Sequence, residues 1–120
     1  MAKGDDIEER LVRFGVKIIE LCSEFPKTDI GRHVSGQLLR CGTSPASNYS
    51  EARGAESSRD LIHKLGIVLK ELNESSIWLR MTDETQLVTD QQVGQFRAEC
   101  TELSKIIAVS IRTALARHKK

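Results

Sequence analysis

The chain has 120 residues, enough for one domain whose core buries roughly two-thirds of the unfolded surface. Its 18 lysines and arginines almost balance 17 acidic residues, which excludes a polycation that coats nucleic acid, so any such binding needs a local patch. No apolar run reaches the ~20 residues that span a bilayer, and the start of the chain is too polar for a secretory signal, which predicts a cytoplasmic protein.

The first predicted helix runs from about 7 to 25 and has two apolar faces. Its core face repeats at steps of three and four, and comprises Ile7, Leu11, Phe14, Ile18, Leu21 and Phe25. Pro26 is expected to end the helix. Val12, Val16 and Ile19 lie on nearly the opposite side. Because surplus apolar surface usually marks an interface, we expect these three residues to contact another copy of the chain.

The second predicted helix, 29–53, crosses a segment that local propensity assigns to a turn. Pro45 has no N–H for the carbonyl of Cys41, and its ring crowds that carbonyl. The apolar stripe nevertheless keeps its phase across the proline, through Val34, Leu38, Cys41, Tyr49 and Ala52. The sequence therefore predicts a helix that continues with a kink. We expect the hydroxyl of Thr43 or Ser44 to bond to the carbonyl that Pro45 leaves free.

Two more amphipathic helices are predicted at 58–82 and 90–117. Ser57 is a candidate N-cap of the former, and Thr89 or Asp90 of the latter. No strand-like alternation competes with the four helical patterns, and the connections between them are short. The predicted fold is all-α, an antiparallel up-down-up-down four-helix bundle, as a single domain spanning 1–120.

A polar stripe runs beside the apolar stripe of the second helix. At ~100° per residue its members fall within about 80° of arc. They are Gln37, Arg40, Ser44, Asn48 and Glu51. Lys64, Glu71 and Glu74 in the third helix can complete a hydrogen-bonded ladder between the two helices. We expect this ladder to fix the register of the helices.

The same region also admits a catalytic or metal-binding interpretation. Glu51, Glu71 and Glu74 supply carboxylates, and His33 or His63 could act as a base or ligand. The spacing argues against this interpretation, because no Glu-x-x-His or His-x-x-x-His motif and no glycine-rich phosphate loop occurs. The widely spaced cysteines Cys22, Cys41 and Cys100 are predicted to be buried, reduced thiols. The sequence thus predicts no catalytic residue, no metal, no cofactor and no enzymatic activity.

Positive charge gathers at the end of the chain, where residues 105–120 contain bases and no acid. Such charge complements the dipole at a helix C-terminus, and it is also suited to an acidic partner. The candidate nucleic-acid contacts are Arg32, Arg40, Arg53, Arg112, Arg117, Lys119 and Lys120. Arg40 leaves this set if it pairs with Glu51 or Glu71.

The motifs of the second and third helices resemble one family. A Gln-Leu-x-Arg motif is followed by Thr-Ser, Asn-x-x-Glu, Lys-Leu-Gly and Glu-x-x-Glu. This order is similar to that of the 23S rRNA intervening-sequence (S23) proteins, and the similarity spans nearly the whole chain. The family motif falls on Gln37, Arg40, Ser44, Asn48, Glu51, Lys64, Gly66, Glu71 and Glu74.

The resemblance implies a four-helix protomer that assembles into a ring-shaped homopentamer. Related accessory proteins of diversity-generating retroelements are associated with nucleic acid and a reverse transcriptase through basic surfaces, whereas this chain is nearly neutral. The sequence predicts a non-enzymatic homo-oligomeric scaffold with weak or partner-dependent RNA or DNA binding. The alternative is an adaptor that binds another protein and has no nucleic-acid role.

Overall fold

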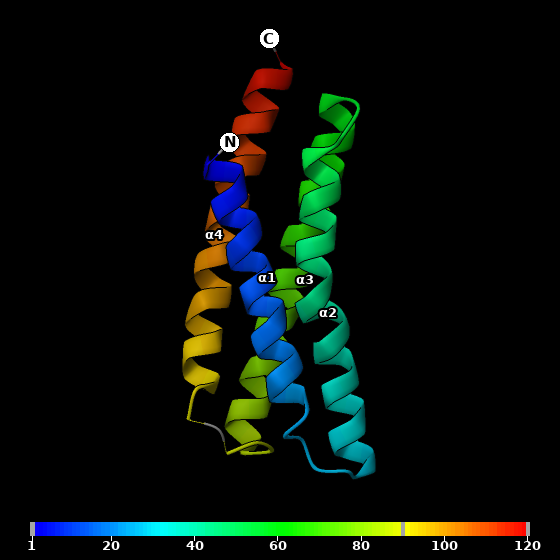
Figure 1. The fold of residues 1–120 in the computed structure, drawn as a ribbon, viewed down its shortest axis with the longest axis vertical. Helices are drawn as coiled ribbons and strands as arrows, with labels where there is room; N and C mark the ends of the chain where they lie inside the picture. Colours follow the sequence, from blue (N-terminus) through cyan, green and yellow to red (C-terminus); the bar gives the residue numbers. More distant parts are fainter. Residues whose placement is uncertain (1, 90, 120) are drawn as a thin grey trace.

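The computed structural model describes residues 2–89 and 91–119, with side chains from residue 4 onward. It contains helices α1 (Ala2–Cys22), α2 (Asp29–Arg53), α3 (Ser58–Thr85) and α4 (Val93–His118). They run alternately up and down in an elongated bundle of 51 × 23 × 20 Å (Figure 1). Within the described ranges there is no strand, so the predicted all-α bundle is confirmed.

The helix ends differ from the predicted bounds by a few residues, for local reasons. Helix α1 starts at Ala2 and stops at Cys22, three residues before the predicted end, because i→i+3 hydrogen bonds tighten the chain ahead of Pro26. Phe25 lies outside the helix yet stays buried. Helix α3 extends to Thr85, where Gln86 adopts a left-handed φ of 54°. Helix α4 begins at Val93 after Gln92, with no side-chain cap, so the predicted cap at Thr89 was wrong; Asp90 lies outside the described residues.

Side-chain caps fix the starts of α2 and α3. The Thr28 hydroxyl accepts a hydrogen bond of 3.1 Å from the Gly31 N–H. The Ser57 hydroxyl accepts an equivalent bond of 3.1 Å from the Asp60 N–H. Each bond satisfies a donor that has no partner inside the helix. The caps place both helix starts within a residue of their predicted positions.

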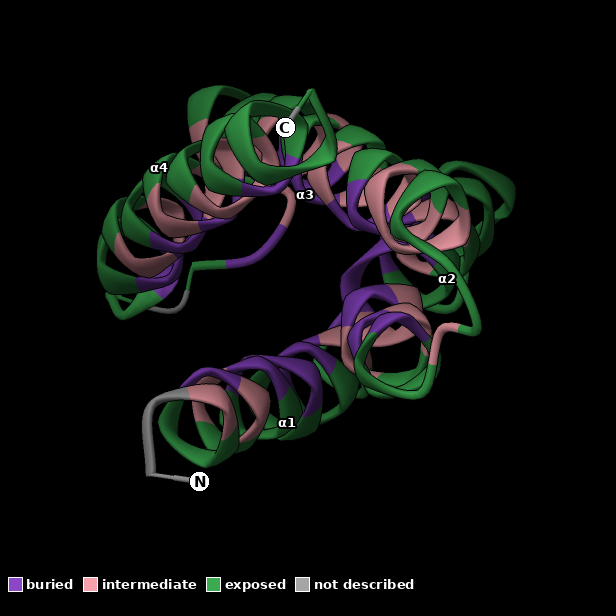
Figure 2. Ribbon diagram, turned by 90° about the horizontal axis from the view of Figure 1, so that it is seen from above, coloured by how far each residue is buried: buried purple, intermediate pink, exposed green. Residues whose placement is uncertain are grey.

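The core is built from the apolar stripes of the four helices. Figure 2 shows that the buried face of each helix is turned toward the inside of the bundle. The predicted core face of the first helix is buried throughout, from Ile7 to Phe25. Helix α3 packs between α2 and α4, whereas α1 packs closely on α2 and only lightly on α4. The bundle is therefore more open on the side between α1 and α4 than elsewhere (Figure 2).

Helix α2 continues through Pro45, as the phase of its apolar stripe predicted. Figure 1 shows a gentle bend along α2 and no break. The expectation about the freed carbonyl was wrong: the Thr43 hydroxyl donates to the Leu39 carbonyl at 2.6 Å, and the Ser44 hydroxyl has no partner among the described residues. A helical threonine reaches the carbonyl four residues earlier, so Thr43 cannot serve Cys41.

Candidate functional site

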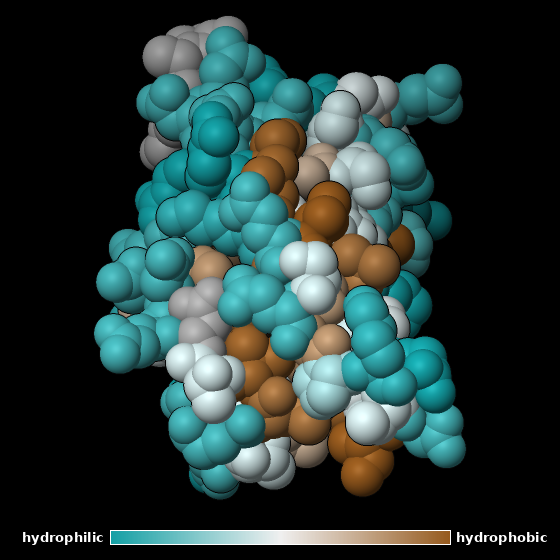
Figure 3. Space-filling model, turned by 60° about the horizontal axis from the view of Figure 1, so that its bottom comes forward, coloured by the Kyte–Doolittle hydropathy of each residue, from teal (hydrophilic) through white to brown (hydrophobic). Residues whose placement is uncertain are grey.

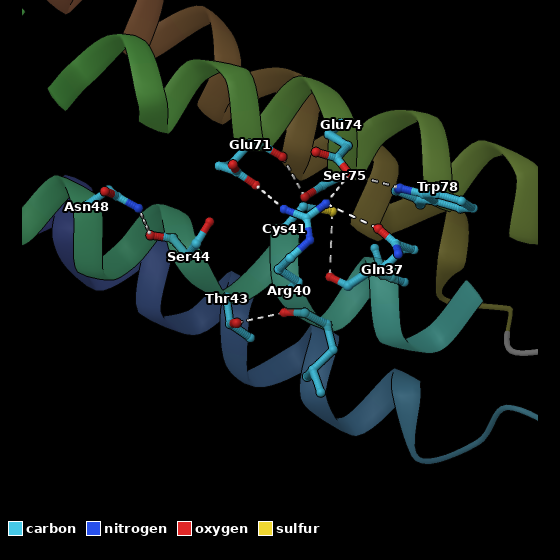
Figure 4. Close-up of polar contacts among 12 residues, drawn as sticks. Gln37, Arg40, Cys41, Thr43, Ser44, Asn48, Glu71, Glu74, Ser75 and Trp78 are labelled. Carbon is cyan, nitrogen blue, oxygen red and sulfur yellow. Dashed lines mark hydrogen bonds and ion pairs between the residues drawn. The ribbon is translucent and has the colours of Figure 1, made fainter. Parts of the chain in front are cut away.

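Arg40 joins α2 to α3 through a cluster of polar side chains (Figure 4). Its Nη1 donates to Glu71 Oε1 at 3.2 Å, and its Nη2 bonds Glu74 and Gln37. Trp78 Nε1 donates to the same Glu74 oxygen, Oε2, at 3.2 Å. We call Gln37, Arg40, Glu71, Glu74 and Trp78 the Arg40 cluster. It bridges the two helices between which the hydrogen-bonded ladder was predicted.

The electrostatics of the Arg40 cluster favour a structural role. Glu71 is the more buried carboxylate, with 14% of its side chain exposed, whereas Arg40 is 51% exposed. Desolvation lowers the pKa of Arg40, but the Glu74 and Glu71 carboxylates outweigh it and raise the pKa. The guanidinium therefore stays charged, and both carboxylates are engaged by hydrogen bonds. Neither is placed as a free general base.

The other predicted ladder residues do not form a continuous network with the Arg40 cluster. Lys64 Nζ donates to Glu51 Oε1 at 2.8 Å, as a separate contact between α3 and α2. Between the two contacts, Asn48 Nδ2 donates to the Ser44 carbonyl of its own helix at 3.0 Å. The ladder consequently consists of two ion-pair contacts separated by residues that bond locally or not at all.

The described side chains offer no metal or thiolate chemistry. Among residues 4–89 and 91–119, no group of three or more His, Cys, Asp or Glu side chains is arranged to hold a metal ion. The cysteines are free, as predicted; Cys41 and Cys100 are buried, whereas Cys22, which was predicted to be buried, is only partly buried. Burial raises the pKa of Cys22 to about 11 and that of Cys100 to about 12. Both thiols therefore stay protonated at neutral pH and are poor nucleophiles.

The candidate nucleic-acid contacts fall into two groups. Arg32, Arg40 and Arg53 are engaged: Arg32 pairs with Asp29 at 3.1 Å, and Arg53 pairs across helices, with residues of α1. In contrast, Arg112 and Arg117 on the last turns of α4, and Lys119 at its C-cap, form no ion pair within the part of the chain that the structure describes. Lys120 lies outside that part. The unpaired positive charge of the candidate set is thus at one end of α4.

Among the described residues, two groups of exposed apolar side chains recur at steps of three and four, each along one helix, on the outside of the bundle. Val12, Val16 and Ile19, which we call the α1 patch, are 40–53% exposed. Ile77 and Met81, which we call the α3 patch, are 54% and 42% exposed. Figure 3 shows hydrophobic side chains breaking through the mostly hydrophilic surface on one face of the molecule.

The α3 patch was missed by sequence reasoning. The spacing of residues in the sequence could have revealed this patch. At ~100° per residue, Ile77 lies about 160° from the buried Leu79. Val16 lies in the same way far from the core face of α1. Helices α1 and α3 are not neighbours in the bundle, and their outer faces point to opposite sides (Figure 2). The two patches are therefore far apart and face away from each other.

Comparisons with known proteins agree with this architecture. A family model described as 23S rRNA-intervening sequence protein matches residues 6–109. A crystal structure of a protein with unknown function from the S23 ribosomal protein family of Bacteroides thetaiotaomicron VPI-5482 has a TM-score of 0.84 and 33% sequence identity. The match covers 92% of this chain and 98% of that chain. A search of the curated proteins finds no match. Neither description names a catalytic activity.

Proposed function

The chain belongs to the 23S rRNA-intervening sequence protein family, and we propose that it acts as a homo-oligomeric helical scaffold rather than as an enzyme. Among the described helices, none is long and apolar enough to cross a membrane. The polar groups of the Arg40 cluster satisfy one another, so the most polar seam of the bundle has a structural explanation. The exposed apolar patches have no such structural explanation within one copy of the chain.

The observation that carries this proposal is the pair of apolar patches on opposite helices. A two-fold dimer uses one self-complementary patch, whereas a head-to-tail contact needs two different patches. When the α1 patch of one copy packs against the α3 patch of the next copy, both patches are buried. Repeated contacts of this kind form a closed ring when the rotation closes. The pentamer implied by the family resemblance is such a ring.

Substitution of one residue in each patch tests the assembly. We expect the wild-type chain to have a mass of about five times 13.4 kDa by light scattering. Val16→Asp and Met81→Asp place a charge in each contact and should both produce small species while the helical content is unchanged. Ile30→Asp is the matched control, because Ile30 is exposed but belongs to neither patch. A monomeric wild-type chain, or variants with wild-type mass, would contradict the proposal.

The nucleic-acid role proposed for the scaffold rests on the cations at the end of α4. A ring would repeat Arg112, Arg117 and Lys119 in every copy, which converts a weak site into a multivalent one. Binding of a structured RNA should then fall steeply between 50 and 200 mM salt. Arg112→Gln with Lys119→Gln should reduce both the affinity and the salt dependence. If no RNA or DNA binds at low salt, the adaptor that binds another protein becomes the better explanation.

A further inference from the structure

A pocket of about 690 Å3 lies at the end of the bundle where α1 and α3 begin and α2 and α4 end. In Figure 1 this is the upper end of the molecule. Because α1 packs only lightly on α4, the ends of these helices leave part of the core uncovered. The volume is within the range of ~300–1,000 Å3 that is typical of small-molecule pockets. Neither the Arg40 cluster nor the two apolar patches contributes to it.

The inner wall of this pocket is apolar. Ile7, Leu65 and Ala114 line it, and each is less than a tenth exposed. Leu61 and Ile106 line it as well and pack against the core. A sugar or nucleotide would lose its hydration against this wall, which offers no side-chain hydrogen bond, although Ser58, Ser110 and Thr113 also line the pocket. The wall is instead suited to a hydrocarbon chain, whose burial is favourable.

Tyr49 adds an unused hydrogen-bond donor to the pocket. Tyr49 lines the pocket and is 7% exposed as a residue, and its hydroxyl forms no hydrogen bond with any described residue. Burial raises the pKa of Tyr49, so the hydroxyl stays protonated and available as a donor at neutral pH. The hydroxyl can therefore donate to an acceptor on a molecule that enters the pocket.

The positive charge at the pocket comes from two arginines that differ in their partners. Arg53 Nη2 contacts Asp5 at 2.9 Å and its Nη1 contacts Glu8 at 3.2 Å, so its charge is neutralised within the chain. Arg117 also lines the pocket and forms no ion pair with a described residue. A single uncommitted positive charge thus stands beside the apolar wall and the Tyr49 hydroxyl.

We propose that this pocket binds an amphipathic monocarboxylate, with its acyl chain against Ile7, Leu65 and Ala114 and its carboxylate between Arg117 and the Tyr49 hydroxyl. An amphipathic cation would be repelled by Arg117. A dianionic phosphate ester would find only one uncommitted cation. The serine and threonine residues that also line the pocket are neutral, so one uncommitted positive charge beside a hydrocarbon wall favours a ligand with a single negative charge.

The binding test uses the only tyrosine and the only tryptophan of the chain as separate reporters. Decanoate, kept below its micelle concentration, is titrated into protein labelled with ¹³C at tyrosine and ¹⁵N at tryptophan. We expect the Tyr49 resonances to shift saturably, while Trp78, which does not line the pocket, stays unchanged. Octanoate should bind about fifteenfold more weakly, given roughly fourfold per methylene. Decanol and decyltrimethylammonium should bind more weakly than decanoate.

Two variants separate a built site from general hydrophobic binding. Arg117→Gln should weaken decanoate binding about tenfold and leave decanol binding unchanged. Ser110→Leu adds an apolar side chain to the pocket wall and should abolish decanoate binding while the thermal midpoint is kept or raised. Equal affinities for decanoate and decanol would overturn the proposal, as would an unshifted Tyr49. So would Tyr49 shifts that follow protein concentration without decanoate, because a second copy would then fill the pocket.

Discussion

Arg40 and Asn48 lie on the same polar stripe of α2, yet only Arg40 reaches α3. The Arg40 guanidinium is long enough to bind Glu71 and Glu74 across the helix seam. The Asn48 amide is short and finds an acceptor at the Ser44 carbonyl, four residues earlier in its own helix. The stripe could be predicted from sequence spacing. Which of its members cross to α3 could not, because that depends on side-chain reach and on local acceptors.

Loss of the Arg40 guanidinium should destabilise the fold more than loss of an equivalent surface pair. Arg40→Gln leaves the mostly buried Glu71 carboxylate without its cation, and a buried unpaired charge is costly. Arg80→Gln is the matched control, because Arg80 pairs within α3 with Glu84, which is 61% exposed. Urea denaturation should show a lower midpoint for Arg40→Gln and almost no change for Arg80→Gln. Equal midpoints for the two variants would contradict a structural role of the cluster.

The Cys100 thiol should make stability depend on pH under alkaline conditions. Burial raises its pKa from the ordinary value of 9.0 to about 12, so the native state resists the ionisation that the unfolded state undergoes. The stabilising effect of the protonated thiol is complete below pH 9 and is lost as pH rises toward 12. The unfolding free energy of the wild type should therefore fall between pH 9.5 and 10.5. Cys100→Ala should make this fall smaller by up to ~1.4 kcal/mol. Parallel pH profiles for variant and wild type would refute this.

At the scale of the helix, the phase of the apolar stripe outweighs the local cost of Pro45 in α2. The residues before and after the proline face the same core, so tertiary packing stabilises a helix that propensity alone would end. The path of the chain through Pro45 was therefore predictable. The end of α1 was less predictable, because the i→i+3 hydrogen bonds of Glu24 and Phe25 keep Phe25 buried without a helix.

Two glycines of α2 should respond in opposite ways to alanine. A Cβ at Gly42 would lie 2.8 Å from Cγ2 of the buried Ile18, so Gly42 permits close packing of α2 on α1. Gly42→Ala should lower the unfolding free energy by ~1–2 kcal/mol, since the strain exceeds the gain in helix propensity. Gly36 has no neighbour within 4 Å of such a Cβ, so Gly36→Ala should raise it by up to ~1 kcal/mol. Thermal unfolding of both variants checks this; stabilisation by both would contradict the close contact.

At the scale of the molecule, the surface carries more information about function than the core does. The four helices and the α1 patch could be predicted, because both follow from periodicity within one helix. The end pocket could not, since it requires residues of all four helices and depends on how lightly α1 packs on α4. The apolar patches on opposite sides of the bundle are the feature on which the proposed assembly depends.

A mixing experiment tests the head-to-tail contact most directly. Val16→Asp spoils the α1 patch and keeps the α3 patch, whereas Met81→Asp does the reverse. Each variant alone should be monomeric by native mass spectrometry. An equimolar mixture should form a one-to-one dimer of about twice 13.4 kDa, because the mixture contains one intact pair of unlike patches. If the mixture stays monomeric while wild type assembles, or if either variant assembles alone, the α1 patch does not bind the α3 patch.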